Sequence, residues 1–106
     1  MILRLWRGWT TAELADSYDE ILNTDVAPGI LARNLDGLRS FDVWRRRPAE
    51  QTGEHEFLTA MVFDDMAAIE RFAGGPTRSY VPPQARAVLT RFDLHSQHYD
   101  LRQRHH

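Results

Sequence analysis

The chain has 106 residues, enough to bury one hydrophobic core, so we expect a single domain spanning residues 1–106. Its formal net charge is −2, which excludes the basic excess of nucleic-acid-binding proteins, and its 13 positive side chains are all arginine. There is no cysteine and no apolar run of membrane-spanning length, so we expect a cytoplasmic protein without disulfides that binds no membrane.

The first half of the chain predicts a strand, a helix and a hairpin. Residues 2–9 carry bulky side chains, most of them apolar, at both odd and even positions, so both faces of a strand would be apolar. This is typical of a sheet covered on both faces. The Thr-Thr-Ala-Glu run at 10–13 matches a capping box, and we expect a helix from there to about Val26, ended by Pro28 and Gly29. Residues 38–46 and 55–63 predict two strands joined by a polar loop over 48–54.

The second half predicts a second helix and a fourth strand. Asp64 or Asp65 can cap a helix that runs to Ala73 and stops at Gly74. A short helix is expected within 83–89, followed by a strand over 92–101. The order βαββαβ predicts an α+β, ferredoxin-like domain whose antiparallel four-stranded sheet places the first strand between the third and the fourth.

Two helices can cover only one face of such a sheet. The other face is also apolar, so we expect a second copy of the chain to cover it in a homodimer.

Four stretches of the sequence, 4–10, 56–58, 64–74 and 98–100, resemble the antibiotic biosynthesis monooxygenase-like family of dimeric α+β barrels. The likeness extends over nearly the whole chain and implies the fold and the dimer. It specifies the reaction less closely, because this fold also serves isomerases, decarboxylases and haem-degrading proteins. Phe63 stands where relatives often have tryptophan, and Arg7 where they often have histidine.

Three polar residues are candidates for catalysis: His98, Tyr99 and Arg4. The His98 imidazole can act as a base near neutral pH, with Tyr99 assisting, or it can be a hydrogen-bonded histidine of the dimer interface. His95 lies three residues earlier, so on one strand the two imidazoles point to opposite faces and cannot share a metal ion. We expect no metal and no other cofactor.

Arg4 lies on the strand expected at the centre of the sheet, where an unpaired charge is costly. Its partner is therefore either a carboxylate, such as Asp93 or Asp100, or an anionic ligand.

Aromatic side chains are numerous for so small a domain and can wall a pocket for a flat ligand. The alternative is that they pack in the core and the interface. The candidates for substrate binding are Trp6, Trp9, Trp44, Phe63, Phe72 and Tyr80.

The resemblance implies a cofactor-free monooxygenase that oxidises a small, electron-rich phenolic or polyketide-like substrate with O₂. Once deprotonated, such a substrate can pass an electron to O₂ without flavin or metal, so the protein need only take the proton, hold the anion and exclude water. Here His98 would be the base and Arg4 would hold the anion. Two alternatives stay open: a non-redox isomerase, cyclase or lyase, and a protein that only binds a small hydrophobic molecule, haem included.

Overall fold

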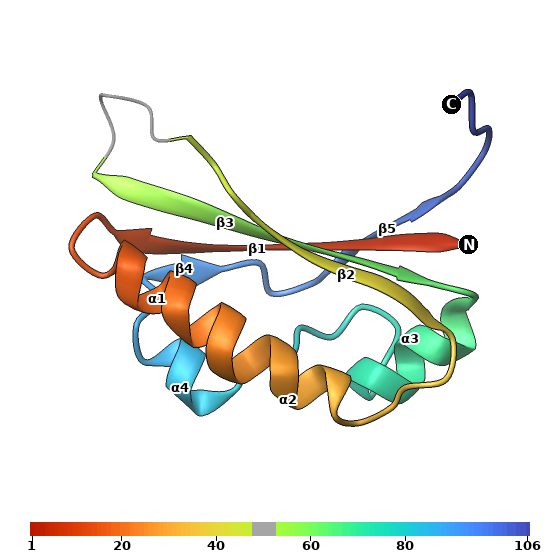
Figure 1. The fold of residues 1–106 in the computed structure, drawn as a ribbon, viewed down its shortest axis with the longest axis horizontal. Coiled ribbons are helices and arrows are strands. Elements are labelled where there is room, and N and C mark those ends of the chain that lie inside the picture. Colours follow the sequence, from red (N-terminus) through yellow and green to blue (C-terminus); the bar gives the residue numbers. More distant parts are fainter. Residues whose placement is uncertain (48–52) are drawn as a thin grey trace.

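A five-stranded antiparallel sheet forms one layer of the protein (Figure 1). The computed structural model describes residues 1–47 and 53–106. The strand order is β2-β3-β1-β4, with β5 also paired to β1, so β1 lies between the third strand and the C-terminal strands as the sequence predicted. The α+β, ferredoxin-like fold is thereby confirmed. The strands are β1 (Ile2–Thr11), β2 (Leu38–Arg45), β3 (Glu54–Phe63), β4 (Arg91–Phe92) and β5 (Gln97–Asp100).

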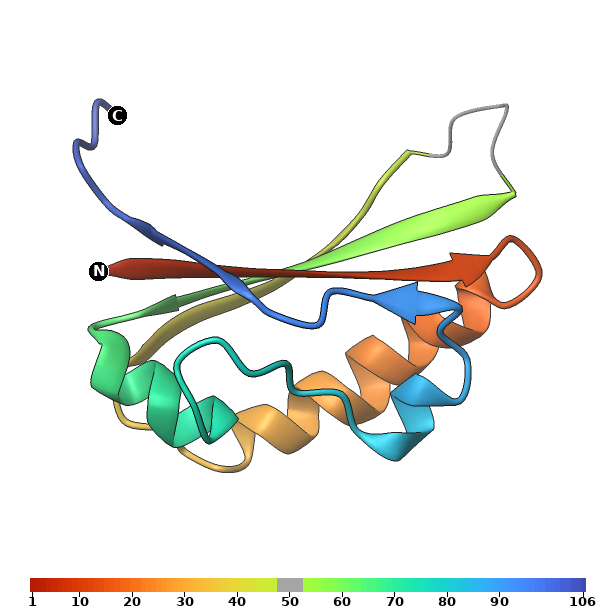
Figure 2. The ribbon, with the colours of Figure 1, turned by 180° about the vertical axis from the view of Figure 1, so that it is seen from behind.

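The helices form a second layer on one face of the sheet, and Figures 1 and 2 show the opposite face uncovered. No helix in the described part of the chain is long and apolar enough to cross a membrane. The loop expected over 48–54 falls mostly outside the described residues, since these exclude 48–52. The helical segments are α1 (Ala15–Ile21), the π-helix η1 (Leu22–Val26), α2 (Ala27–Leu31), α3 (Met66–Ala73) and α4 (Pro83–Arg86).

The first helix begins and ends later than the sequence predicted. Residues 10 and 11 belong to β1, and the Thr10 hydroxyl donates to the carbonyl of Thr11, so the capping box does not form. The helical path then continues through η1 to Leu31. In η1 the turn widens, with the Ala27 N–H bonded to the Leu22 carbonyl, and Pro28 falls in the first turn of α2, where proline is tolerated.

The expected fourth strand is interrupted by residues 93–96, leaving β4 and β5 as separate strands. The reason is a side chain: the Asp93 carboxylate accepts from the backbone N–H of Arg7 at 3.0 Å, a donor that a continuous strand would use. The Asp93 carbonyl also accepts a hydrogen bond from the indole N–H of Trp6 at 3.0 Å.

Helix α3 has the predicted ends. Asp65 is its N-cap and accepts from the Ala68 N–H at 2.9 Å, while Gly74 ends the helix with φ 78°.

We expect Asp65→Ala to lower the free energy of unfolding by about 1 kcal/mol, because one helix N–H loses its acceptor. Chemical denaturation measures this. Asp65→Asn keeps an acceptor oxygen and should lose less than half as much; equal losses would contradict the capping role.

The two faces of the sheet differ in side-chain packing. On β1, Ile2, Arg4 and Trp6 are buried toward the helices, while Leu3 and Leu5 on the other face are only partly buried. The uncovered face also carries large exposed aromatic side chains from β2 and β5 (Trp44, 59 % exposed, and Tyr99, 51 %).

Candidate functional site

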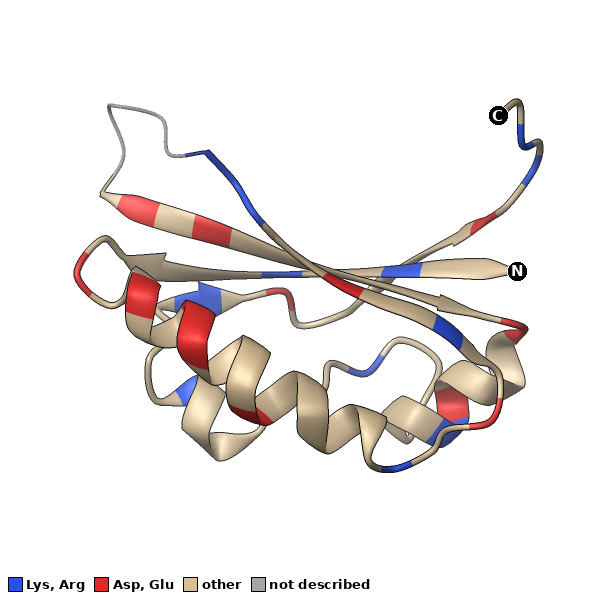
Figure 3. Cartoon of the chain, viewed as in Figure 1, with Lys and Arg blue, Asp and Glu red and all other residues tan. Residues whose placement is uncertain are grey.

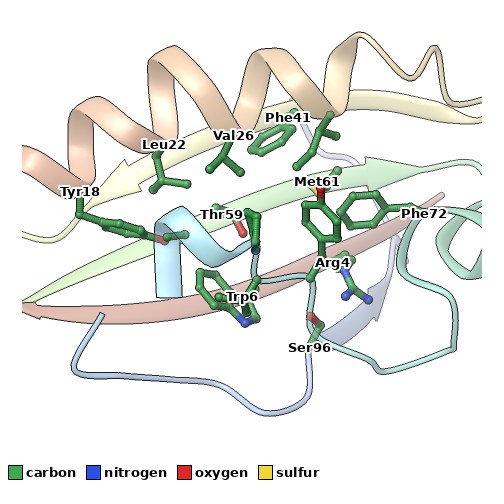
Figure 4. A pocket seen from close by; sticks show the side chains of 15 residues that line it. Arg4, Trp6, Tyr18, Leu22, Val26, Phe41, Thr59, Met61, Phe72 and Ser96 are labelled. Atoms are coloured by element: carbon green, nitrogen blue, oxygen red, sulfur yellow. The ribbon is translucent and has the colours of Figure 1, made fainter. Parts of the chain in front are cut away.

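A small cavity of about 30 Å³ lies between the sheet and the helices. Its volume is about that of one water molecule in the liquid, so a ring-sized ligand enters only if wall side chains move. The wall combines apolar side chains with a few polar ones, and Figure 4 shows their arrangement. The residues that bear on chemistry are Arg4, Trp6, Tyr18, Phe72, Tyr80 and Ser96.

Arg4 is a buried cation at this cavity, only 3 % exposed. Its Nη1 lies 3.0 Å from His98 Nε2, its Nη2 donates to the Arg78 carbonyl, and its guanidinium lies over the Phe72 ring, 5.6 Å from the centroid. Burial lowers the pKa of Arg4 to about 10. Within residues 1–47 and 53–106, Arg4 makes no ion pair with a carboxylate, which is unusual for a buried charge.

The two carboxylates considered as partners of Arg4 lie elsewhere. Asp93 makes a bidentate pair with Arg7, with distances of 3.0 and 3.2 Å. Asp100 is exposed on β5 and lies opposite Ile2 rather than Arg4. Neither of these salt bridges is formed, and among the described residues the guanidinium is held by neutral groups.

His98 lies directly opposite Arg4 in the pairing of β1 with β5. Because a guanidinium only donates hydrogen bonds, His98 Nε2 must be the acceptor, which places the proton of the neutral ring on Nδ1. Burial and, second, the charge of Arg4 lower the pKa of His98. At pH 7 the ring is thus a neutral base in contact with Arg4, although it does not itself line the cavity.

The aromatic wall is held in place by hydrogen bonds and ring contacts. The Trp6 indole N–H donates to the Asp93 carbonyl at 3.0 Å and to the Ser79 hydroxyl at 3.2 Å, so a face of the ring is left for the cavity. Phe72 and Tyr80 pack with their ring planes tilted by 49° and their centroids 5.2 Å apart, and Arg33 lies over both rings.

Besides His98, four of the predicted site residues do not line this cavity. Tyr99 follows His98 on β5 and points to the uncovered face, so it cannot contact a ligand in the cavity. Trp44 is on the same uncovered face. Trp9 bonds Glu56 at 3.2 Å and lies under Arg91, while Phe63 is fully buried against Phe72.

His95 and His98 do not share a site. His95 lies in the segment between the two short strands, where its Nδ1 is 3.3 Å from the Thr77 hydroxyl. In the part of the chain that is described, no three metal-ligating side chains come together.

Of the six cavity residues that bear on chemistry, two were not predicted as site residues from the sequence: Tyr18 and Ser96. Tyr18 fits the apolar face of the first helix, and a core position is the ordinary interpretation of that spacing. Ser96 reaches the cavity because the strand breaks before it, and the sequence carries no local signal for that break.

A second hollow, of about 410 Å³, lies on the uncovered face of the sheet. It is shallow and mostly apolar, and the last residues of the chain form one side of it. Its lining includes Met1, Leu3, Val62, Tyr99 and Leu101.

Comparison with known proteins supports the fold. No protein-family model matches the sequence, and no curated protein matches it. Among solved structures, a Bacillus cereus protein provisionally described as an antibiotic biosynthesis monooxygenase matches with a TM-score of 0.66 at 10 % identity, covering 97 % of this chain and 94 % of that one. An ethyl tert-butyl ether D (EthD) family protein from Bacillus halodurans matches with a TM-score of 0.57 at 17 % identity, covering 96 % and 100 %. The chain therefore has the α+β fold of these two proteins, which is the fold that its sequence resemblance implied.

Proposed function

We propose that this protein is a cofactor-free monooxygenase that binds a small, electron-rich phenolic or polyketide-like substrate as its anion beside Arg4. One observation carries the proposal: a buried guanidinium that pairs with no carboxylate of the described residues faces a cavity walled by Trp6, Phe72 and Tyr80. An anionic substrate would supply the missing negative charge, and the flat walls suit an aromatic ring.

The chemistry needs no external reductant. Deprotonation gives a phenolate or enolate that donates one electron to O₂; the substrate radical and superoxide then combine to form a C–O bond. Loss of water from the resulting peroxide cleaves the O–O bond and leaves a new carbonyl. For an anthrone-like CH₂ group the balance is CH₂ + O₂ → C=O + H₂O, with all four electrons drawn from the substrate.

The Arg4–His98 pair suits the first step. The guanidinium stabilises the anion, which lowers the pKa of the substrate hydroxyl. His98 is the base, since its Nε2 lone pair is unprotonated and only 3.0 Å from Arg4 Nη1. When the substrate hydroxyl takes the place of Arg4 as the donor to Nε2, the proton passes to His98 and Arg4 is left to pair with the anion.

The same pair also suits a non-redox isomerase, cyclase or lyase, which needs the anion but not O₂. Turnover under strict anaerobiosis would favour that reaction. For a protein that only binds its ligand, His98→Ala would leave affinity nearly unchanged and there would be no turnover to lose.

The direct test is oxygen consumption by metal-stripped protein with a panel of anthrone-like phenols. We expect uptake of one O₂ per molecule oxidised, and no stimulation by added metal or flavin. An absence of uptake across a broad panel would contradict the monooxygenase proposal.

We propose in addition that two copies of the chain pair through the uncovered face of the sheet. That face carries apolar side chains at Leu3, Leu5 and Val62, with Asp42 and Gln97 in the same cross-strand row as Leu5. Figure 3 shows acidic residues at the start of β3 and arginines at the end of β2 and beyond β5. An interface between two copies would bury the apolar side chains and could pair the charged ones around them.

Trp44→Arg should shift the protein from dimer to monomer by light scattering, because it places a charge on this face. Leu31→Arg is the matched control, since Leu31 is exposed to a similar degree (54 % against 59 %) but lies at the end of α2 on the opposite layer. Equal masses for the two variants would contradict the proposed interface.

A further inference from the structure

One wall of the cavity is a segment without regular secondary structure, residues 75–82, which joins α3 to α4 (Figure 2, in teal). Tyr80, Val81 and Pro82 of this segment line the cavity. The same three residues also line an open hollow of about 380 Å³, and Tyr80 is 39 % exposed. The segment is therefore a single layer of chain between the cavity and the open hollow.

The start of the segment has the backbone freedom that a hinge needs. Gly74 ends α3 with φ 78°, and Gly75 follows it without a side chain. Two adjacent glycines can absorb a change in φ and ψ that would strain other residues. The far end is fixed, because Pro83 is already the first residue of α4.

The main chain of the segment is tied to the sheet at one place. The Ser96 N–H donates to the Thr77 carbonyl at 2.9 Å, and Arg78 lies opposite His95 in an isolated antiparallel bridge. A bridge of this kind opens locally at much lower cost than the long pairing of β1 with β3.

Side chains from the cavity hold the segment in two further places. The Trp6 indole N–H donates to the Ser79 hydroxyl at 3.2 Å, and Arg4 Nη2 donates to the Arg78 carbonyl. The second contact matters most, because a backbone oxygen of the wall thereby occupies part of the guanidinium that an anionic ligand would need.

We propose that residues 75–82 are the lid of the cavity and that the hydrogen bond from Arg4 to the Arg78 carbonyl is its latch. The lid rests on the proposed function for its ligand, an aromatic anion. A cavity of about 30 Å³ admits no ring while the wall is closed, so entry requires the lid to open. A phenolate accepts from a guanidinium more strongly than a peptide carbonyl does, because the bond then joins opposite charges. Local opening admits the ligand, and the anion then replaces the Arg78 carbonyl at Arg4.

The first test is amide hydrogen exchange without ligand, with rates corrected for the intrinsic exchange of each residue. We expect the Ser96 N–H to exchange at least about 100-fold faster than the amides that pair β1 with β3. Arg4→Met should raise the Ser96 rate about tenfold further, because the latch is lost. Arg39→Met is the control, since Arg39 is exposed on β2 and pairs with Asp64, and it should leave the Ser96 rate within twofold. Exchange of Ser96 as slow as that of the β1–β3 amides, or no acceleration in Arg4→Met, would overturn the proposal.

The second test closes the lid covalently. The chain has no cysteine, so Arg78→Cys combined with His95→Cys creates the only thiol pair. Directly opposite residues of an antiparallel bridge have Cα atoms about 4.5 to 5.5 Å apart, a separation that a disulfide spans. The substitution at 78 keeps the backbone carbonyl, so the latch remains in place.

The probe for the locked lid is 4-nitrophenol, at a pH where it is ionised, and its association is followed by quenching of tryptophan fluorescence in stopped flow. We expect oxidation of the double variant to lower the association rate at least tenfold and reduction with dithiothreitol to restore it. The reduced form is the matched control, because it has the same sequence and an open disulfide.

Equal association rates in the oxidised and reduced forms, or no binding in either, would overturn the lid. Hydrogen exchange uses no ligand and 4-nitrophenol binding uses no O₂, so an absence of oxygen uptake leaves the lid standing. Oxygen uptake by a protein whose oxidised and reduced forms bind 4-nitrophenol equally fast would leave the monooxygenase standing without a lid.

Discussion

Replacing Arg4 by methionine should strongly impair substrate binding and turnover without destabilising the protein. Arg4 is buried, and its partners are an imidazole and a carbonyl rather than a carboxylate. Burial therefore costs the folded state the hydration of a charge that no carboxylate in residues 1–47 and 53–106 pairs with. Methionine fills a similar shape and keeps the contact with Phe72. We expect the free energy of unfolding to be unchanged or to rise by about 1 to 3 kcal/mol.

The same substitution should lower kcat/KM by about 10² to 10³-fold, because the developing anion loses the cation that faces it. Arg7→Met is the matched control: Arg7 is on the same strand, faces the other side of the sheet and pairs with Asp93. It should lower stability by up to about 1 kcal/mol and leave kcat/KM within a few-fold. A marked loss of stability in Arg4→Met would show that Arg4 is a structural residue and would contradict its role as an anion site.

Much of the fold follows from local sequence signals. The paired central strands were predicted from residues 2–9 and 55–63, which carry apolar side chains at both odd and even positions. Alternation along a strand determines which side chains share a face. Asp65 and Gly74 predicted both ends of α3, since each acts within one helical turn. Alternation along β1 also predicted that Arg4 and Trp6 lie on one face of the sheet and Trp9 on the other.

The remainder depends on contacts between residues far apart in the chain. At the break in the last strand, the Asp93 carboxylate accepts from the backbone N–H and the guanidinium of Arg7, so it does not pair with Arg4. A choice between Asp93 as a partner of Arg4 or of Arg7 requires the register of β1 against β4, which strand patterns do not determine. Ser96 enters the cavity through that same break. The polar side of the site was therefore less predictable than its aromatic wall.

Activity should rise with pH through an inflection below 6.5 and fall again near pH 10. The lower limb reports His98, which must be unprotonated to act as a base, and whose pKa is lowered by burial and by Arg4. The upper limb reports Arg4, whose pKa of about 10 means that the anion loses its cation above that pH. Initial rates from pH 4.5 to 10.5 measure both limbs. His98→Gln keeps an acceptor for Arg4 but cannot titrate, so it should lose the lower limb together with about 10² to 10⁴-fold in rate.

The free energy of unfolding should also depend on pH through His98. Because the pKa of His98 is lower in the folded state than its ordinary value of 6.5, the unfolded chain binds the proton more tightly. The free energy of unfolding is therefore at its full value above pH 6.5, declines as the pH falls below it, and stops declining from this source once the pH is below the folded pKa of His98. Denaturant unfolding measures this free energy against pH for the protein and for His98→Gln, and the difference between the two profiles is the contribution of His98. The control is His95→Gln, at an exposed position. In Arg4→Met, the inflection of the stability profile that His98 causes should move up toward 6.5, because the charge of Arg4 is removed while burial remains. An unmoved inflection would show that the two groups are not coupled. The base of the proposed reaction would then be another residue.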